Sequence, residues 1–425
     1  MGILQSESHL HLYGCLAAKD FFQDVHDRIE THASRFKWFV AEYYKATGIE
    51  VNPSNWRHPS DGFEIFKHHF ICAKQTSFDV FQAKFNLLIA LYPPTPDDMT
   101  LANKVFQSHA ISGGYREYRT FLPLYLPNHE RARYLKNLIL TAKSHEHPRY
   151  HPRIAISFSR TDSEAFESYR FLTDFLKENT DLNSYVTGVD FCGNERGHPP
   201  YAKKRLFSDI LHDRGQGAHA LDILYHVGEM WDKIAIHSAT RWCVETSMLG
   251  VRRLGHALAL GLNPDILVHR KIFEPRAEAE SHLAWLALHR DLLHDCGYTI
   301  KHYEWLLRRM ESSTKESYIE WYYDADLIEH TRMFQNACLQ IIKRYSPIIE
   351  ACPTSNFRIG ALGSWSNHPL LRFLDHDLDV TISTDDPGIF AISLESEEKL
   401  AKETFKLSDS TLHQMEARTR SLFQR

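Results

Sequence analysis

The chain has 425 residues, which is enough for one large domain or two ordinary ones. Its formal net charge of −5 gives no broad basic field that would point to nucleic acid. No apolar run is long enough to span a membrane. Seven cysteines without a CxxC pair favour free thiols, and the first motif lies close to the N-terminus. We therefore expect a cytoplasmic protein without a signal peptide.

The first predicted strand covers residues 6–12, where polar and apolar side chains alternate. The alternation places His9 and His11 on the same face. Two histidines on one strand face can bind one metal ion. Solvated histidines on a polar outer face would give the same pattern, so both interpretations stay open.

Residues 18–110 are mainly helical in pattern. Within this segment, Ser77 is a candidate N-cap for a helix on which three phenylalanines share one face. These are Phe78, Phe81 and Phe85. They fit either ordinary core packing or an aromatic lid over a planar ligand.

Seven further segments predict strands, and helical patterns separate most of them. They are residues 113–119, 153–158, 185–191, 222–227, 253–256, 348–353 and 379–384. Eight short strands alternating with helices predict an α/β fold, a parallel (β/α)8 TIM barrel with extra helices in a single domain over residues 1–425. Between strands six and seven, residues 263–346 predict a helical insertion, which would cover the site or mediate association.

Candidate site residues follow the carboxyl ends of five predicted strands, which is the face where active sites of this fold lie. They are His9, His11, Gly193, His226, Glu229, His256, Asp385 and Asp386. Histidines that are only solvated would not be expected to follow the carboxyl ends of the strands in this way. The sequence therefore predicts one site built from distant parts of the chain.

Three histidines and one aspartate in this set offer nitrogen and oxygen ligands: His9, His11, His226 and Asp385. Such a set suits zinc, with iron, cobalt or manganese as weaker alternatives. A metal ion of this kind lowers the pKa of a bound water toward neutrality. His256 would take a proton from that water, and Glu229 would donate one to a substrate nitrogen. Asp386 adds an orienting contact.

A site that activates water on one side of a substrate and donates a proton from the other suits hydrolytic attack on an amidine-like carbon. Deamination of an aminopurine is a reaction of this kind. A non-catalytic binding barrel would have lost some ligands, and all are present here. An amidohydrolase with two metals bridged by lysine would need that lysine on the fourth strand, which offers Asp190, Cys192 and Gly193 instead. A cytidine-deaminase-type zinc site is excluded because no Pro-Cys-x-x-Cys motif occurs.

Seven motifs together resemble those of the adenosine deaminase family of the amidohydrolase superfamily. They occur in the family's order across nearly the whole chain. They are SHLHLYG at 8–14, DFCGNE at 190–195, HVGE at 226–229, RLGH at 253–256, CPTSN at 352–356, HP at 368–369 and STDDP at 383–387. Each motif is weak alone, but the ordered set is specific.

The resemblance implies a role for each matched residue. One zinc ion per chain would be bound by His9, His11, His226 and Asp385. Glu229 would protonate purine N1, and His256 would orient and deprotonate the water. Asp386 would contact N7 and the Gly193 backbone would contact N3. The lid would be Phe78, Phe81 and Phe85. The implied reaction attacks carbon 6, releases ammonia and leaves a 6-oxopurine.

The chain departs from the family at Tyr13, where adenosine deaminases usually have an aspartate that contacts the ribose 5′-hydroxyl. We therefore predict that Tyr13 faces the ribose and that the 5′ group differs. The expected partner is a small-molecule purine without nucleic acid. Adenosine, a 5′-modified adenosine, adenine and an AMP-like nucleotide all stay open, as does the oligomeric state.

Overall fold

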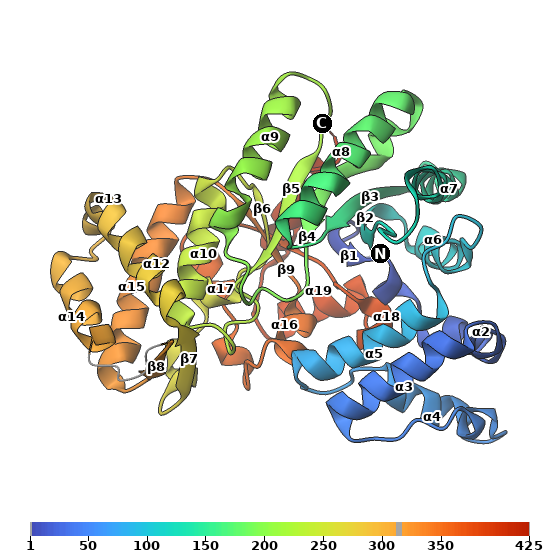
Figure 1. The fold of residues 1–425 in the computed structure, drawn as a ribbon, viewed down its shortest axis with the longest axis horizontal. Helices are drawn as coiled ribbons and strands as arrows, with labels where there is room; N and C mark the ends of the chain where they lie inside the picture. The colour runs from blue at the N-terminus through green and yellow to red at the C-terminus, as the bar shows by residue number, and fades with distance from the viewer. Residues whose placement is uncertain (1, 312–316, 425) are drawn as a thin grey trace.

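The structure, a computed structural model, describes residues 2–311 and 317–424. Eight parallel strands form a nearly closed barrel in the order β1-β2-β3-β4-β5-β6-β9-β10, with helices around it (Figure 1). A bridge between Leu10 and Asp385 joins β1 to the chain that follows β10. The predicted (β/α)8 barrel is confirmed.

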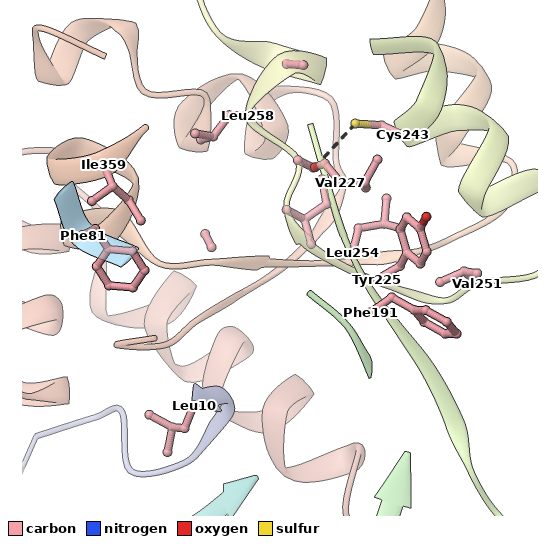
Figure 2. Close-up of a cluster of buried hydrophobic side chains, with 14 of the residues drawn as sticks. Leu10, Phe81, Phe191, Tyr225, Val227, Cys243, Val251, Leu254, Leu258 and Ile359 are labelled. Atoms are coloured by element: carbon pink, nitrogen blue, oxygen red, sulfur yellow. Dashed lines mark hydrogen bonds between the residues drawn. The ribbon is translucent and has the colours of Figure 1, made fainter. Parts of the chain in front are cut away.

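The barrel strands match the eight predicted segments. Their bounds are β1 Glu7–His11, β2 Gly114–Phe121, β3 Tyr150–Phe158, β4 Val186–Phe191, β5 Asp222–Val227, β6 Arg253–His256, β9 Ile348–Ala351 and β10 Asp379–Ile382. Every residue of β5 and β6 is buried, as expected for parallel strands covered on both faces. Figure 2 shows Tyr225, Val227 and Leu254 of these strands beside Cys243 of helix α10 (Ile236–Met248).

The segment before β2 is helical, as predicted. It contains α1 Ala18–Phe22, α2 Val25–Thr31, α3 Ala33–Thr47, η2 Pro53–Arg57, α4 Gly62–Phe70, α5 Phe78–Leu91 and α6 Thr100–Ser112. The Ser77 hydroxyl caps α5 by accepting the backbone N–H of Val80 at 3.3 Å. Phe81 of α5 stacks on Phe390, with ring centroids 5.5 Å apart. This contact anchors α5 to the segment that follows the last barrel strand.

The remaining helices surround the barrel or follow its last strands. The bounds are η1 Tyr13–Cys15, α7 Asn128–His145, α8 Asp162–Glu178, η3 Thr180–Tyr185, η4 Pro200–Lys203, α9 Lys204–Gly215, α10 Ile236–Met248, α11 Leu258–Gly261, α16 Pro353–Ile359, η6 Trp365–Asn367, α17 Leu370–Asp375, α18 Pro387–Phe390, α19 Leu394–Glu403 and α20 Asp409–Ser421. In the part of the chain that is described, no helix combines the length and apolar character needed to cross a bilayer.

The predicted helical insertion at residues 263–346 is only partly helical. It contains η5 Pro264–Leu267, β7 Lys271–Pro275, α12 Arg276–Leu288, α13 Arg290–Asp295, α14 Ile300–Glu311, β8 Tyr318–Tyr322 and α15 Ala325–Lys343. The strands β7 and β8 pair antiparallel in a sheet of their own. Helix α15 packs against α10 and α11 as the crossover before β9, so the added unit is shorter than predicted.

Candidate active site

A pocket at the carboxyl ends of the barrel strands brings most of the predicted site residues together. Its empty space is about 560 Å³, including the part that opens to solvent. The predicted residues that line it are His11, Phe78, Phe81, Phe85, Gly193, His226, Glu229, His256, Asp385 and Asp386. His9 is fully buried beside them.

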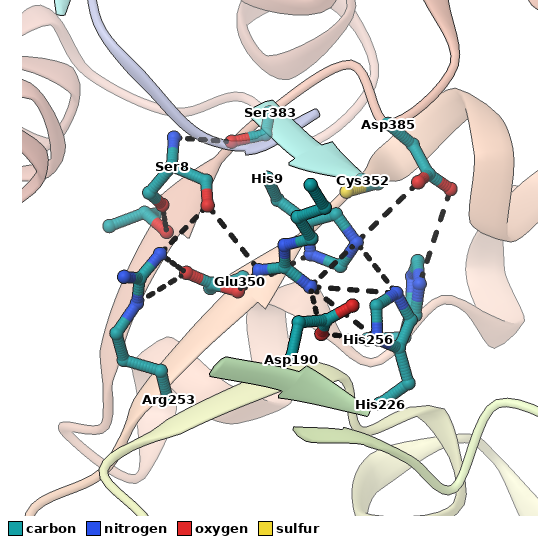
Figure 3. A network of polar contacts seen from close by, with 12 residues as sticks. Ser8, His9, Asp190, His226, Arg253, His256, Glu350, Cys352, Ser383 and Asp385 are labelled. Carbon is teal, nitrogen blue, oxygen red and sulfur yellow. Dashed lines mark hydrogen bonds and ion pairs between the residues drawn. The ribbon is translucent and has the colours of Figure 1, made fainter. Parts of the chain in front are cut away.

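The four predicted ligand atoms converge on one point, and Figure 3 labels three of the residues, His9, His226 and Asp385. Nε2 of His226 lies 3.0 Å from Nε2 of His9 and 3.3 Å from Nε2 of His11. Oδ1 of Asp385 lies 3.5 Å and 3.3 Å from the same two nitrogens. A tetrahedral ion with bonds near 2.0–2.1 Å has ligand–ligand distances of roughly 3.3 Å. The four residues therefore fit one metal ion, and among the described residues the buried Oδ1 of Asp385 has no hydrogen-bond partner.

Polar side chains contact the other nitrogen or oxygen atoms of three of these ligands. Nδ1 of His226 lies 3.1 Å from Oδ1 of Asp190, so its N–H donates there and leaves Nε2 free to bind a metal. Nδ1 of His9 lies 3.3 Å from Glu350, and Ser355 donates to Oδ2 of Asp385 at 2.7 Å. This arrangement fixes the direction in which each ligand points.

Two arginines, Arg119 and Arg253, lie inside the barrel with almost no exposure, and Figure 3 labels Arg253. Arg119 donates to Asp190 at 3.2 Å and also pairs with Glu350. Arg253 donates to Glu350 at 2.8 Å and to Glu117 at 3.0 Å. Burial opposes ionisation of Asp190, but the charges of His226 and Arg119 hold its pKa below the ordinary value. Sequence reasoning missed this network, although Glu117 and Arg119 share one face of β2.

Glu229 is set up to carry a proton. Burial, followed by the nearby charge of Asp385, raises its pKa well above the ordinary value. The loop that carries it is held by Glu195, which accepts the backbone N–H groups of Gly228 and Glu229 at 2.8 Å and of Met230 at 3.0 Å. Gly228 has φ of 71°, a conformation that favours glycine. Sequence reasoning quoted Glu195 in a motif but gave it no role.

His256 and Asp385 both have left-handed backbones, with φ of 63° and 65°. Such strain in residues other than glycine is concentrated at functional sites. Nε2 of His256 lies 3.7 Å from Glu229 and 4.0 Å from Asp385. Burial lowers the pKa of His256 to about 3, so its ring is neutral. Its Nδ1 lies 2.8 Å from the side-chain nitrogen of Asn356.

Asp386 and Gly193 both present polar groups to the pocket. Burial and the charge of Asp385 raise the pKa of Asp386 well above its ordinary value. A Cβ at Gly14 would lie 1.6 Å from Oδ1 of Asp386, so only glycine allows this approach. Gly193 has φ of 81° and no atom within 4 Å of the position of a Cβ. Its backbone therefore faces open space.

Tyr13 is the one predicted substrate residue that does not line the pocket among the residues described. Its ring is buried, and its hydroxyl bonds to Tyr134. The turn η1 begins at Tyr13, separated from the end of β1 by one residue, so Tyr13 does not continue the strand. The prediction that it faces the ribose is not supported by this placement.

Phe121 and Cys192 line both the pocket and a second, adjoining hollow. The polar residues of the second hollow are Ser157, Ser159, Arg160, Thr161, Ser168, Asn194 and His198. Arg160 donates to the carbonyl oxygens of Phe191 at 3.1 Å and His226 at 2.7 Å, which joins the ends of β4 and β5. Sequence reasoning did not find this arginine.

Comparison with known proteins connects the chain to one family. The family model described as Adenosine deaminase matches residues 323–421. An adenine deaminase from Rhizobium leguminosarum bv. trifolii is 38% identical over 80 residues, which cover 18% of this chain and 25% of that protein. The aligned part thus spans about a quarter of that relative's length.

Solved structures match almost the whole chain. An amidohydrolase from Burkholderia ambifaria with bound Zn has a TM-score of 0.53 at 14% identity and covers 99% of this chain and 85% of its own. Arabidopsis ADAL complexed with IMP has a TM-score of 0.56 at 14% identity, over 99% of this chain and 96% of its own. At these identities the likeness shows a shared fold.

Proposed function

Because the chain belongs to the adenosine deaminase-like amidohydrolases, we propose that it hydrolytically deaminates a 6-aminopurine nucleoside. Water replaces the 6-amino group, which leaves as ammonia, and the product is the 6-oxopurine. The observation that carries the proposal is one pocket in which four converging ligand atoms lie beside the buried Glu229, whose pKa is raised by burial. Adenine, AMP and other modified adenosines are the alternative substrates.

The proposed metal is one zinc ion per chain, held by His9, His11, His226 and Asp385. The spacing of the four atoms and the nitrogen-rich donor set support zinc. The amidohydrolase from Burkholderia ambifaria contains Zn in the same fold. When bound, the ion would supply Lewis-acid activation of the attacking water.

Recognition of the purine follows from hydrogen-bond chemistry. The ring nitrogens N1, N3 and N7 of a 6-aminopurine are all acceptors, and the pocket offers three donors. Glu229 donates to N1, the backbone N–H of Gly193 to N3, and protonated Asp386 to N7. Protonation at N1 makes carbon 6 more electrophilic. The 6-oxopurine product carries its own hydrogen on N1. This N–H cannot accept a hydrogen bond from Glu229, so the contact that bound the substrate becomes repulsive and the product is released.

Phe78, Phe81 and Phe85 of α5 form the apolar side of the pocket. Aromatic rings pack on a planar base and exclude water from it. The polar hollow beyond Phe121 and Cys192 gives room for a ribose and its 5′ substituent. This extra space favours a nucleoside or nucleotide over the free base, and ADAL, which shares the fold, holds IMP.

The proposal is tested by measuring ammonia release from adenosine, 2′-deoxyadenosine, 5′-methylthioadenosine, adenine, AMP and N6-methyl-AMP. We expect turnover of at least one nucleoside or nucleotide by the zinc-loaded protein. Glu229→Gln should keep one zinc per chain and lose turnover by about 100- to 10,000-fold, because it removes the general acid. Glu395→Gln, at an exposed position on α19, is the matched control.

Two results would contradict this proposal. A Glu229→Gln variant with the wild-type rate would remove Glu229 from its role. Absence of ammonia from every compound, with zinc bound, would favour a different aminopurine or a binding protein.

A further inference from the structure

Asn356 lies on α16 with no exposed surface, between the backbone of Cys352 and the ring of His256. Its Oδ1 accepts the backbone N–H of Cys352 at 3.3 Å. Its Nδ2 lies 2.8 Å from Nδ1 of His256. A backbone N–H can only donate, so the amide oxygen must face Cys352 and the amide NH2 must face the imidazole.

Nδ1 of His256 is therefore a hydrogen-bond acceptor. A neutral imidazole with an accepting Nδ1 carries its single proton on Nε2. His256 lines the pocket, and its Nε2 lies 3.7 Å from Oε1 of Glu229. An N–H at this position can donate a hydrogen bond but has no lone pair with which to take a proton.

We propose that Asn356 is a positioning residue that sets the tautomer of His256, so that His256 meets the attacking oxygen as a hydrogen-bond donor and not as its base. The proposal rests on the function proposed above and refines it. The donated bond aims an oxygen lone pair at carbon 6 and stabilises negative charge on that oxygen.

The protons then balance through Glu229 alone. Glu229 gives its proton to N1 and takes one from the attacking water. It passes that proton to the departing amine as the C–N bond breaks, and it regains a proton from the new hydroxyl as the carbonyl forms. Ammonia and the 6-oxopurine leave, and Glu229 is protonated again.

Asn356→Asp is the informative variant. One carboxylate oxygen still accepts the N–H of Cys352, while the other accepts a hydrogen bond from the ring. His256 then moves its proton to Nδ1 and turns a lone pair toward the pocket. Asn103→Asp introduces the same substitution at an exposed position of α6 and is the matched control.

The tautomer is measured directly by two-bond 1H–15N correlation spectra of protein with 15N-labelled imidazoles, with and without Zn2+. The His256 signals are assigned by their loss in a His256→Gln variant. We expect the Nε2–H pattern in the wild type and in Asn103→Asp, and the Nδ1–H pattern in Asn356→Asp. An Nδ1–H pattern in the wild type overturns the proposal, even if the Asn356 variant does not fold.

Kinetics separate this positioning role from a structural one. Loss of a donor to the attacking oxygen lowers kcat by about 100-fold, and we expect KM to change little in Asn356→Asp. Wild-type kcat in a variant with the Nδ1–H pattern would refute the donor role. If the wild type releases no ammonia from any compound, the proposed function fails, whereas the spectrum still decides the tautomer.

Discussion

At the residue scale, Asp190 connects the ligand set to the charged interior of the barrel. Its Oδ1 accepts from Nδ1 of His226 at 3.1 Å and from Arg119 at 3.2 Å. A carboxylate in this place fixes the ring of a metal-binding histidine and raises its basicity. Asp190 thus supports the proposed ligand His226 without itself belonging to the proposed ligand set.

Asp190→Asn should lower zinc affinity by about 10- to 100-fold, because an amide retains the shape but loses the charge behind His226. Competition with a chromogenic chelator measures the affinity, and circular dichroism checks that the variant is folded. Asp174→Asn, at an exposed position on α8, should bind zinc as the wild type does. Unchanged zinc affinity in Asp190→Asn would show that the charge of Asp190 does not contribute to zinc binding.

The sequence was sufficient to predict that His9, His11, His226 and Asp385 meet, because strand ends in a parallel barrel lie on one face. It did not reveal Arg119, because a charged residue in a short strand has the same pattern whether it faces solvent or a buried partner. The resemblance to the family placed Tyr13 at the ribose; among the described residues its side chain is buried and does not line the pocket, and its role stays a prediction.

At the element scale, α10, α12 and α15 each bury one histidine where the insertion meets the barrel. Ring centroids of His237 and His282 lie 4.8 Å apart, and Nε2 of His330 lies 2.7 Å from the hydroxyl of Tyr298. Both ring nitrogens of His282 are buried without a hydrogen-bond partner in the described chain. Burial, and then the charge of His237, lowers the pKa of His282 well below 6.5.

These helices should therefore lose stability in acid. The unfolded chain binds a proton on His282 near its ordinary pKa of 6.5, whereas the folded chain does not. The unfolded state binds more protons below that value, so the stability contributed by neutral His282 is lost as the pH falls. We expect hydrogen exchange of α12 to accelerate from about pH 7 to about pH 5, after correction for intrinsic rates, and His282→Leu to reduce the acceleration.

His413→Leu, at an exposed position on α20, is the control and should leave the pH response unchanged. Equal acceleration in His282→Leu and the wild type would assign the acid response to other groups.

All eight barrel strands were predicted, because short strand-like segments alternate with helical patterns along most of the chain. The strands β7 and β8 were missed because five-residue segments carry a weak pattern and their buried faces contain polar atoms. Glu274 is 1% exposed and accepts from the indole of Trp321 at 2.8 Å. A buried carboxylate paired with an indole cannot be distinguished, in sequence, from an exposed glutamate.

At the scale of the whole molecule, the insertion is joined to the segment that carries Glu229, the proposed proton donor. The hydroxyl of Tyr323, just after β8, accepts the backbone N–H of Ile236 at 3.1 Å. Ile236 begins α10, and the loop before it contains Glu229 and Trp231. Trp231 in turn donates to the carbonyl of Gly360 at 2.8 Å. The insertion therefore supports the pocket from outside.

Tyr323→Phe should destabilise the protein by about 1–3 kcal/mol, because it leaves the buried N–H of Ile236 without a partner. Denaturant unfolding measures the loss. Hydrogen exchange should show faster opening of residues 228–236 than in the wild type. Tyr201→Phe, at an exposed position, is the control. Equal exchange of residues 228–236 in both variants would show that the insertion does not stabilise the segment that carries Glu229.

The seam between β1 and the chain after β10 determines when the site can form. The N–H of His11 donates to the carbonyl of Asp385 at 3.0 Å, and the N–H of Asp385 donates to that of His9 at 3.2 Å. During translation, His9 leaves the ribosome long before Asp385 is made. A nascent chain offers histidines but no closing carboxylate until its last barrel strand emerges. Loading of the proposed metal would therefore follow synthesis, and a chain truncated before β10 lacks one of the four proposed ligands.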